Sequence, residues 1–305
     1  MEPPFFSIII PTYNRGHFLP RAIDSVCSQT YGDWELWVVD DGSTDETSQV
    51  VERYCQQDGR IRYVQQSNQR VSAARNLGLA QAAGKYLCFL DSDDAYREDH
   101  LQTFADAIAS GLPNHLLYTK FMLIRGSEEQ VFEPPDRGKS YAAADAGRIL
   151  SVFLPYSPPV QTICIPASLR GKVFFQSTYN YAECYDFCAR CAAWVTPQWI
   201  DKVTVCLHIH GGNISEASNN LEELRFYSKQ LEEFSDMAKD PFYAGIQGNE
   251  VFIDKRTQLH ANIIKCYFRE RAYRASALQF FRLVRWRPSF LFSKQCFVLA
   301  LQLVG

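Results

Sequence analysis

Residues 86–94, YLCFLDSDD, place three carboxylates within four positions directly after a hydrophobic run. The run at residues 86–90 has the length and composition of a buried β-strand. Asp91, Asp93 and Asp94 follow it, and carboxylates this close together raise the cost of ionising one another. Because hard divalent cations prefer oxygen ligands, the stretch predicts a strand that ends in a cation site.

Strands and helices alternate through the residues that precede this stretch. Apolar runs predict strands over residues 6–11, 35–40, 61–65 and 86–90. Apolar residues at helical spacing predict helices over 17–29 and 71–83, and Ser43-Thr44-Asp45-Glu46 is a capping-box signature for a helix that reaches residue 57. This alternation predicts a parallel sheet covered on both faces, in which ligands bind at the carboxyl ends of the strands.

Polar residues stand at three of these predicted strand ends. Residues 12–14 (TYN) follow the first strand, residues 40–42 (DDG) end the second, and residues 91–94 (DSDD) follow the fourth. One such cluster could cap a helix, but three at one edge of a sheet indicate a binding site.

The second half of the chain is less regular. Strands are predicted over residues 115–124, 160–166 and 203–210, a surface loop over 125–140, a helix over 181–194, and helices from residue 221 to the end. Cys184, Cys188 and Cys191 share one face of the predicted helix. Zinc binding is one interpretation, but core packing is favoured because no CxxC pair accompanies them.

Composition narrows the possible classes. The chain has 305 residues and a net charge of −3, which gives no general attraction to nucleic acid. We expect no signal peptide and no membrane span, because no apolar stretch reaches about 18 residues. A cytoplasmic protein with reduced cysteines is therefore expected.

Three motifs resemble a known family. SIIIPTYNR (7–15), VVDDGSTDET (38–47) and ARNLGLAQAAGKYLCFLDSDD (74–94) are similar to the N-terminal half of family 2 glycosyltransferases with the GT-A fold. The resemblance implies transfer of a sugar from a nucleotide-sugar donor to an acceptor hydroxyl, with inversion. It also implies a GT-A-type α/β domain with a mostly parallel sheet over residues 1–215, of which 1–100 bind nucleotide and 101–215 the acceptor. Residues 216–305 lie outside the resemblance, and their own pattern predicts a helical extension.

The resemblance also assigns the residues of the donor site. Tyr13 would pack on the base and Asp41 would read the uracil edge, which favours UDP, although a turn with helix N-terminal charge also explains Asp41. Arg75 would face either the phosphates or a neighbouring carboxylate. Pro11, Asn14 and Ser92 would complete the nucleotide site.

The implied metal ligands follow from the same comparison. Asp93 would hold Mn²⁺ or Mg²⁺ against the diphosphate, and Asp91 would bind the ribose or a metal-bound water. Asp94 would alternatively cap the following helix. His210, in HIHGGN, would reach the metal or pyrophosphate, although a single histidine after a strand is often only structural.

The pattern breaks at the position of the general base. Related enzymes have a Glu-Asp pair, as in GEDYDLWLR, where this chain reads AECYDF (182–187) with Cys184 at the base position. A thiol has an ordinary pKa of about 8.5. Glu183 and Asp186 would raise it further, and no basic residue adjoins it in the sequence. Glu183 or Asp186 could serve as the base instead, the chain could bind donor without transfer, or the cysteine could be a change particular to this sequence.

The C-terminal residues 265–294 carry eight basic side chains and one acid, interleaved with aromatic residues. This pattern indicates a membrane-surface element that suits a lipid-linked acceptor; the alternative is a helical pair with a solvated basic rim. We expect a transferase in surface glycan synthesis, cytoplasmic or peripheral at the inner face of the membrane. One alternative is a catalytically impaired subunit that binds the donor or acts as a scaffold. A less favoured alternative is a nucleotidyltransferase, which should have a Gly-rich phosphate-binding loop after the first strand; the stretch PTYNRGHF at that position is not such a loop.

Overall fold

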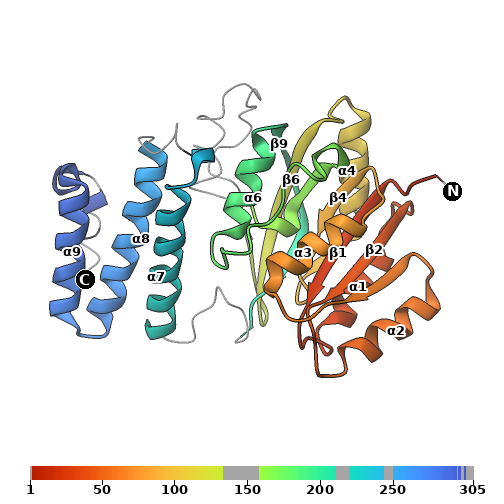
Figure 1. Cartoon of the computed structure of the whole chain (residues 1–305), viewed down its shortest axis with the longest axis horizontal. Helices are drawn as coiled ribbons and strands as arrows, with labels where there is room; N and C mark the ends of the chain where they lie inside the picture. Colours follow the sequence, from red (N-terminus) through yellow and green to blue (C-terminus); the bar gives the residue numbers. More distant parts are fainter. Residues whose placement is uncertain are drawn as a thin grey trace. The chain divides into compact units, whose positions relative to one another are not determined.

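The computed structural model describes residues 2–132, 158–210, 220–243, 250–293, 295, 296 and 299. The chain forms two compact units, residues 1–209 and 210–305 (Figure 1). The predicted boundary between residues 215 and 216 lies outside the described residues.

Four parallel strands form the first part of the sheet in unit one. They lie in the order β3-β2-β1-β4, with β1 Phe6–Thr12, β2 Trp34–Asp40, β3 Ile61–Gln65 and β4 Tyr86–Phe89. Every residue of β1 is buried, as expected for a strand covered on both faces. The four predicted strands are therefore confirmed.

Three helices cover the two faces of this parallel part. Side chains of α1 (Leu19–Cys27) and α2 (Thr47–Gln57) share a core with Ile8 and Ile10, whereas α3 (Arg70–Gln81) shares one with Ile9 and Val39. The capping-box prediction is wrong: α2 begins at Thr47, and its N-cap Glu46 makes no side-chain capping bond. Ser43 binds the neighbouring loop, and Asp45 binds both that loop and the N–H of Thr47, the first residue of α2.

The second part of the sheet is mixed. It contains β5 (Ala95–Tyr96), β6 (His115–Arg125), β7 (Glu128–Phe132), β8 (Ile163–Pro166) and β9 (Thr196–His208), with helices α4 (His100–Ala109) and α6 (Glu183–Ala192). The strand β8 pairs antiparallel with both β4 and β6, and β9 runs parallel to β6. The parallel strands β1 to β4 and the mixed strands therefore belong to one sheet, with the order β3-β2-β1-β4-β8-β6-β9-β5.

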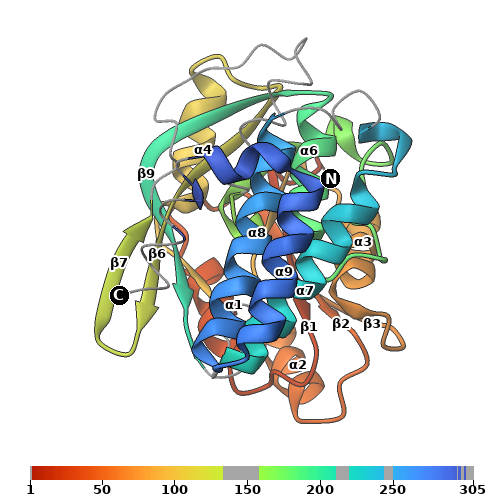
Figure 2. The same ribbon diagram turned by 90° about the vertical axis from the view of Figure 1, so that its left-hand side faces the viewer.

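Two predictions for this half need correction. Residues 128–132, predicted as loop, form β7, which pairs with β6 as a hairpin (Figure 2); residues 133–140 of that prediction lie outside the described part. The predicted strand over 160–166 begins as a 3₁₀ turn, η1 (Val160–Thr162), before β8. A second turn, η2 (Ala167–Leu169), follows β8. Cys188 and Cys191 are buried in the hydrophobic core, which supports core packing.

Unit two is helical in its described residues. It contains α7 (Asn220–Met237), α8 (Glu250–Arg269) and α9 (Tyr273–Trp286), with short turns η3 (Pro241–Tyr243) and η4 (Pro288–Phe292). The helix α8 packs against both α7 and α9 (Figure 1). Ile264, Leu283, Phe290 and Leu299 form a hydrophobic cluster of their own. No helix among the described residues is long and apolar enough to cross a membrane.

Candidate functional site at the carboxyl ends of the strands

The loops after β1 and β2 are bonded to each other. Asn14, at a φ of 52°, donates its N–H to Ser43 Oγ (2.8 Å) and accepts the Thr44 N–H on Oδ1 (2.8 Å). The Gly16 N–H donates to Asp45 Oδ2 at 3.1 Å. Asparagine tolerates a positive φ better than most residues, so this position suits its backbone as well as its side chain. The two loops therefore form one rigid rim, next to which Tyr13 stays 47% exposed.

The two carboxylates of the DDG turn serve different neighbours. Asp40 is fully buried and accepts hydrogen bonds from Tyr63 Oη (2.6 Å) and the Ser43 N–H (2.8 Å). Asp41 accepts three hydrogen bonds from the start of α3 and the segment before it. The donors are Gln66 Nε2 (2.7 Å) and the N–H groups of Gln69 (2.8 Å) and Arg70 (2.7 Å). Asp41 thus fixes the start of α3. Since a carboxylate offers about four acceptor positions, one remains for a ligand, and the reading of uracil stays a prediction.

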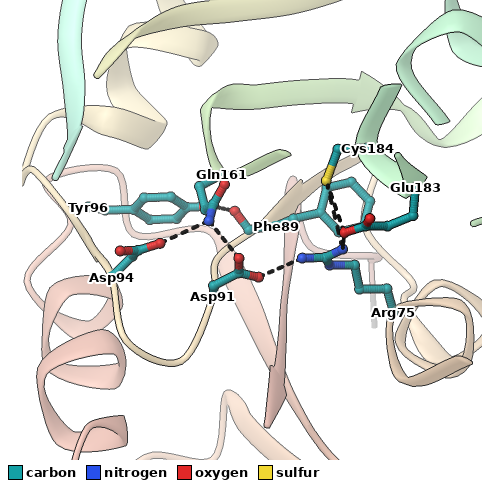
Figure 3. Close-up of polar contacts among 8 residues, drawn as sticks. All are labelled: Arg75, Phe89, Asp91, Asp94, Tyr96, Gln161, Glu183 and Cys184. Carbon is teal, nitrogen blue, oxygen red and sulfur yellow. Dashed lines mark hydrogen bonds and ion pairs between the residues drawn. The ribbon is translucent and has the colours of Figure 1, made fainter. Parts of the chain in front are cut away.

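Arg75 is the centre of a buried charge network (Figure 3). Its Nη2 lies 2.8 Å from Asp91 Oδ1, and its Nη1 lies 3.3 Å from Glu183 Oε1 and 3.9 Å from Cys184 Sγ. Its side chain is only 3% exposed. Burial lowers its pKa, but the charges of Asp91 and Glu183 outweigh burial and raise the pKa, so Arg75 stays a cation. Arg75 thus contacts carboxylates, one of its two predicted partners, and a contact with the donor phosphates stays a prediction.

Gln161 bridges two of the three aspartates, and the sequence reasoning missed it. Its Nε2 donates to Asp91 Oδ2 (2.6 Å) and Asp94 Oδ2 (2.8 Å) (Figure 3). Asp94 also accepts the His208 N–H at the end of β9 (2.9 Å), so the idea that it caps the following helix is wrong. Burial, together with the charges of Asp91 and Asp93, raises the pKa of Asp94 well above its usual range. The one available signal was a polar pair inside an otherwise apolar run after two prolines.

Two arginines from the first loop and helix approach Asp93. Arg15 Nη1 lies 3.9 Å from Asp93 Oδ2, and the Arg21 guanidinium donates to the Asp93 carbonyl. Ser92, between the aspartates, is buried. Arg15 stands beside the motif residues 11–14, which could have indicated it, whereas nothing in the sequence singles out Arg21. The structure therefore places Asp91, Asp93 and Asp94 at the edge of the sheet next to three arginines.

The start of α6 brings the candidate bases to this network. Glu183 is buried; burial raises the pKa of its carboxyl, and Arg75 offsets part of that rise. Burial and then Glu183 raise the pKa of the Cys184 thiol well above its usual range, although Arg75 lowers it. The sequence suggested no cation beside Cys184; the structure corrects this, since Arg75 lies there from a distant part of the chain. Asp186 is fully buried and accepts from Arg190 Nε at 2.8 Å, an ion pair of its own.

The residues at 91–94 can supply part of a divalent cation's shell. Among the described residues, no three His, Cys, Asp or Glu side chains gather to hold a metal ion by themselves. The aspartates are hard oxygen donors, however, of the kind that divalent cations prefer. A cation that shares its coordination with a diphosphate fits this edge. His210 is the first residue of unit two and Gly211 to Asn213 lie outside the described residues, so its metal role stays a prediction.

Comparisons with solved structures identify the type of fold. TarS 1-349 of S. aureus, in complex with UDP-GlcNAc, matches with a TM-score of 0.60 at 19% identity, covering 94% of this chain and 91% of that one. The mannosyltransferase PcManGT of Pyrobaculum calidifontis, in complex with GDP-Man and Mn²⁺, matches with a TM-score of 0.59 at 16% identity, covering 100% and 86%. The fold is therefore of the GT-A type, as predicted, with a helical C-terminal region.

Sequence comparisons identify the family. Residues 7–120 match Glycosyl transferase family 2. An uncharacterised glycosyltransferase of Nostoc sp. is 30% identical over 227 residues, which cover 71% of this chain and 69% of that protein. One of Rickettsia felis is 47% identical over 96 residues, so the match covers 32% of this chain and only 16% of the relative's length. The chain belongs to glycosyl transferase family 2.

Proposed function

We propose that the chain transfers a sugar from a nucleotide-sugar donor, UDP-linked in view of Asp41, to an acceptor hydroxyl with inversion. The observation that carries this proposal is the network in which Arg75 joins Asp91, at the end of β4, to Glu183, at the start of α6. The network places the aspartates of residues 91–94, where the donor would bind, beside the buried carboxylate of Glu183. An inverting transfer needs both a donor site and a general base next to it.

In this proposal Glu183 is the general base. It would take the proton of the acceptor hydroxyl while that oxygen attacks the anomeric carbon and the bond to the diphosphate oxygen breaks. A base works best when its pKa lies near the working pH, and burial moves the pKa of Glu183 in that direction. Cys184 is the weaker candidate because burial and Glu183 hold its thiol protonated. Asp186 is weaker because its side chain is fully buried and lies closer to its arginine, 2.8 Å from Arg190 against 3.3 Å from Glu183 to Arg75.

The donor diphosphate would lie over the aspartates. Asp93, assisted by Asp91, would hold Mn²⁺ or Mg²⁺, which would supply neutralisation of the negative charge on the leaving diphosphate. Arg15, 3.9 Å from Asp93, is a second positive group at the same edge. Tyr13, half-exposed beside the loop that Asn14 fixes, would stack on the base.

The acceptor class follows from the family rather than from the site. We propose a growing surface glycan or polysaccharide, on a carrier lipid or as free glycan, with the protein in the cytoplasm or at the inner membrane face. TarS forms a complex with UDP-GlcNAc, and PcManGT forms one with GDP-Man and Mn²⁺, which supports a nucleotide-sugar donor for this chain.

A catalytically impaired donor-binding or scaffold subunit is the second candidate. The observation in its favour is Cys184, a protonated thiol at the position where the related enzymes carry the expected acid. Both candidates predict donor binding, and they differ in turnover.

Calorimetric titration with UDP, with and without Mn²⁺, tests the donor site. We expect metal-dependent binding that Asp93→Ala weakens strongly and that Asp106→Ala, a change on the exposed face of α4, leaves unchanged. If no nucleoside diphosphate binds in the presence of metal, the proposed activity is wrong.

Variants at α6 then separate the two candidates. Donor turnover, measured as release of UDP, should fall at least about a hundredfold in Glu183→Gln, a loss typical of a missing general base, and change little in Cys184→Ser. A Cys184→Asp variant that gains turnover by orders of magnitude, from a negligible start, would support the impaired subunit instead.

A further inference from the structure

The outward face of α9 is apolar at its centre. Phe281 is 68% exposed and Leu278, one helical turn before it, is 55% exposed, while Tyr273 at the start of the helix is 56% exposed. The opposite side of α9 packs inward through Ser276, Gln279 and Leu283, which are buried. We call Arg274, Leu278, Phe281, Arg282 and Arg285 the α9 face. Its apolar pair is therefore surplus to the packing of unit two.

Positive charge surrounds this apolar pair. Arg274, Arg282 and Arg285 are exposed, and the sequence has no aspartate or glutamate from residue 271 to residue 305. Among the described residues, Arg287 pairs with Asp254 of α8 at 2.7 Å, whereas no carboxylate pairs with Arg274, Arg282 or Arg285. The cations of the α9 face are thus available to an external anion.

The seam between α8 and α9 adds to this positive potential. The Arg256 guanidinium carbon lies 4.4 Å from the centre of the Trp286 ring, and Arg256 Nε is buried without a hydrogen-bond partner in the described structure. Burial, with the charges of Arg256 and Arg282, lowers the pKa of His260 to about 4. The seam therefore carries uncompensated charge of the same sign as the α9 face.

We propose that the α9 face docks on the surface of an anionic phospholipid bilayer. Phe281 and Leu278 enter the boundary between headgroups and acyl chains, and the three arginines bind lipid phosphates around them. A second copy of the same face would bring like charges together, which disfavours self-association. A nucleic acid would leave Phe281 and Leu278 without an apolar partner, so a bilayer fits both halves of the pattern.

Docking would bring unit one to the membrane, where a lipid-linked acceptor resides. Only this consequence rests on the proposed function, because the charge and exposure of the α9 face stand without it. Membrane binding and donor binding are measured separately, so one can fail while the other holds.

Flotation of the full-length chain with vesicles tests the proposal. We expect binding to vesicles of phosphatidylcholine with phosphatidylglycerol at low salt, and little binding to phosphatidylcholine alone. Each arginine near an anionic leaflet contributes roughly a fivefold factor in partitioning, so Arg274→Gln with Arg285→Gln should lower it about 25-fold. Leu278→Ser with Phe281→Ser should lower it at least about tenfold, because the apolar insertion is lost.

Matched changes on α7 provide the control. Leu221 is 52% exposed and Lys229 is exposed in an ion pair with Glu232, so Leu221→Ser with Lys229→Gln should leave flotation unchanged. Circular dichroism checks that every variant is folded, and UDP titration of the same samples reports on unit one. The proposal is overturned if the parent chain does not float with anionic vesicles, if the α7 variant loses as much as the α9 variants, or if the chain binds a soluble polyanion such as heparin but no vesicle.

Discussion

Arg75 connects Asp91, in the proposed donor site, to the proposed base Glu183. Replacing Arg75 should therefore change the pH dependence of turnover. A lysine has one point charge and cannot span Asp91 and Glu183 as the guanidinium does. Arg75 lowers the pKa of Glu183 against the rise that burial causes. In Arg75→Lys the pKa of Glu183 should therefore rise further. Since a base must be deprotonated to act, the acid limb of UDP release should move to higher pH.

The measurement is the pH profile of kcat/KM for the parent chain and Arg75→Lys. Arg53→Lys, an exposed arginine of α2, is the control and should keep the parent profile. A purely structural role for Arg75 predicts lower activity at all pH values with an unmoved acid limb, and that result would contradict our assignment.

Gln161 should stabilise the folded chain by satisfying buried carboxylate oxygens. Gln161→Leu removes the donor that Asp91 and Asp94 share, and an unsatisfied buried polar group costs about 1–3 kcal/mol. Urea denaturation should show a loss of that size in the free energy of unfolding. Gln102→Leu, which removes an exposed hydrogen bond to Asp106 on α4, should lower the free energy of unfolding far less. Equal, small effects of both changes would mean that the bridge contributes nothing measurable.

These residues show how far the site was predictable. Asp41 and Asp91 follow β2 and β4, the parallel strands on either side of β1, so their place at one edge follows from the order of the elements. Gln161 lies 70 residues beyond Asp91, in a turn that pairing of β8 with β4 and β6 brings back. The sequence could not predict the partner of Arg75 either. Glu183 is 108 residues away, and a guanidinium binds phosphates and carboxylates alike.

At the scale of elements, the predictions succeeded where burial left a pattern. The strands β1, β2 and β4 are largely apolar runs because both faces of the sheet are covered there. The hairpin strand β7, EEQVF, is mostly exposed, so it carries no such run and was predicted as loop. The strand β9 begins seven residues before the predicted start, and its pairing with β6 shifts register near Lys120, which interrupts the alternation.

The joint between the β1 and β2 loops offers a test at this scale. Asn14→Gly removes the bond from Thr44 to the side chain but keeps a backbone suited to a φ of 52°, and should cost about 1 kcal/mol of folding free energy. Asn14→Ala also strains the backbone and should cost about 1–2 kcal/mol more. Chemical denaturation of both variants gives the comparison. Equal losses for glycine and alanine would show that the side-chain bond alone matters.

At the scale of the molecule, each unit has its own hydrophobic clusters. Among the described residues, two clusters in unit one draw on residues between 5 and 207, and one cluster in unit two draws on residues between 261 and 299. The order of elements predicted the α/β part and the change to helices. It could not assign an energy to each part, because cooperativity depends on which side chains share a core and not on their order in the chain.

Separate cores should give separate unfolding transitions. Leu283 in unit two and Leu101 in unit one are both fully buried, so Leu283→Ala and Leu101→Ala form a matched pair, each expected to cost about 2–5 kcal/mol. Scanning calorimetry should resolve two transitions, with Leu283→Ala lowering the Tm of one and Leu101→Ala that of the other. Added UDP with Mn²⁺ should raise only the transition that Leu101→Ala lowers, because a ligand stabilises the unit that binds it. A single transition that both substitutions lower alike would mean that the two cores unfold as one cooperative structure, and the helical unit would then contribute to the stability of the donor site.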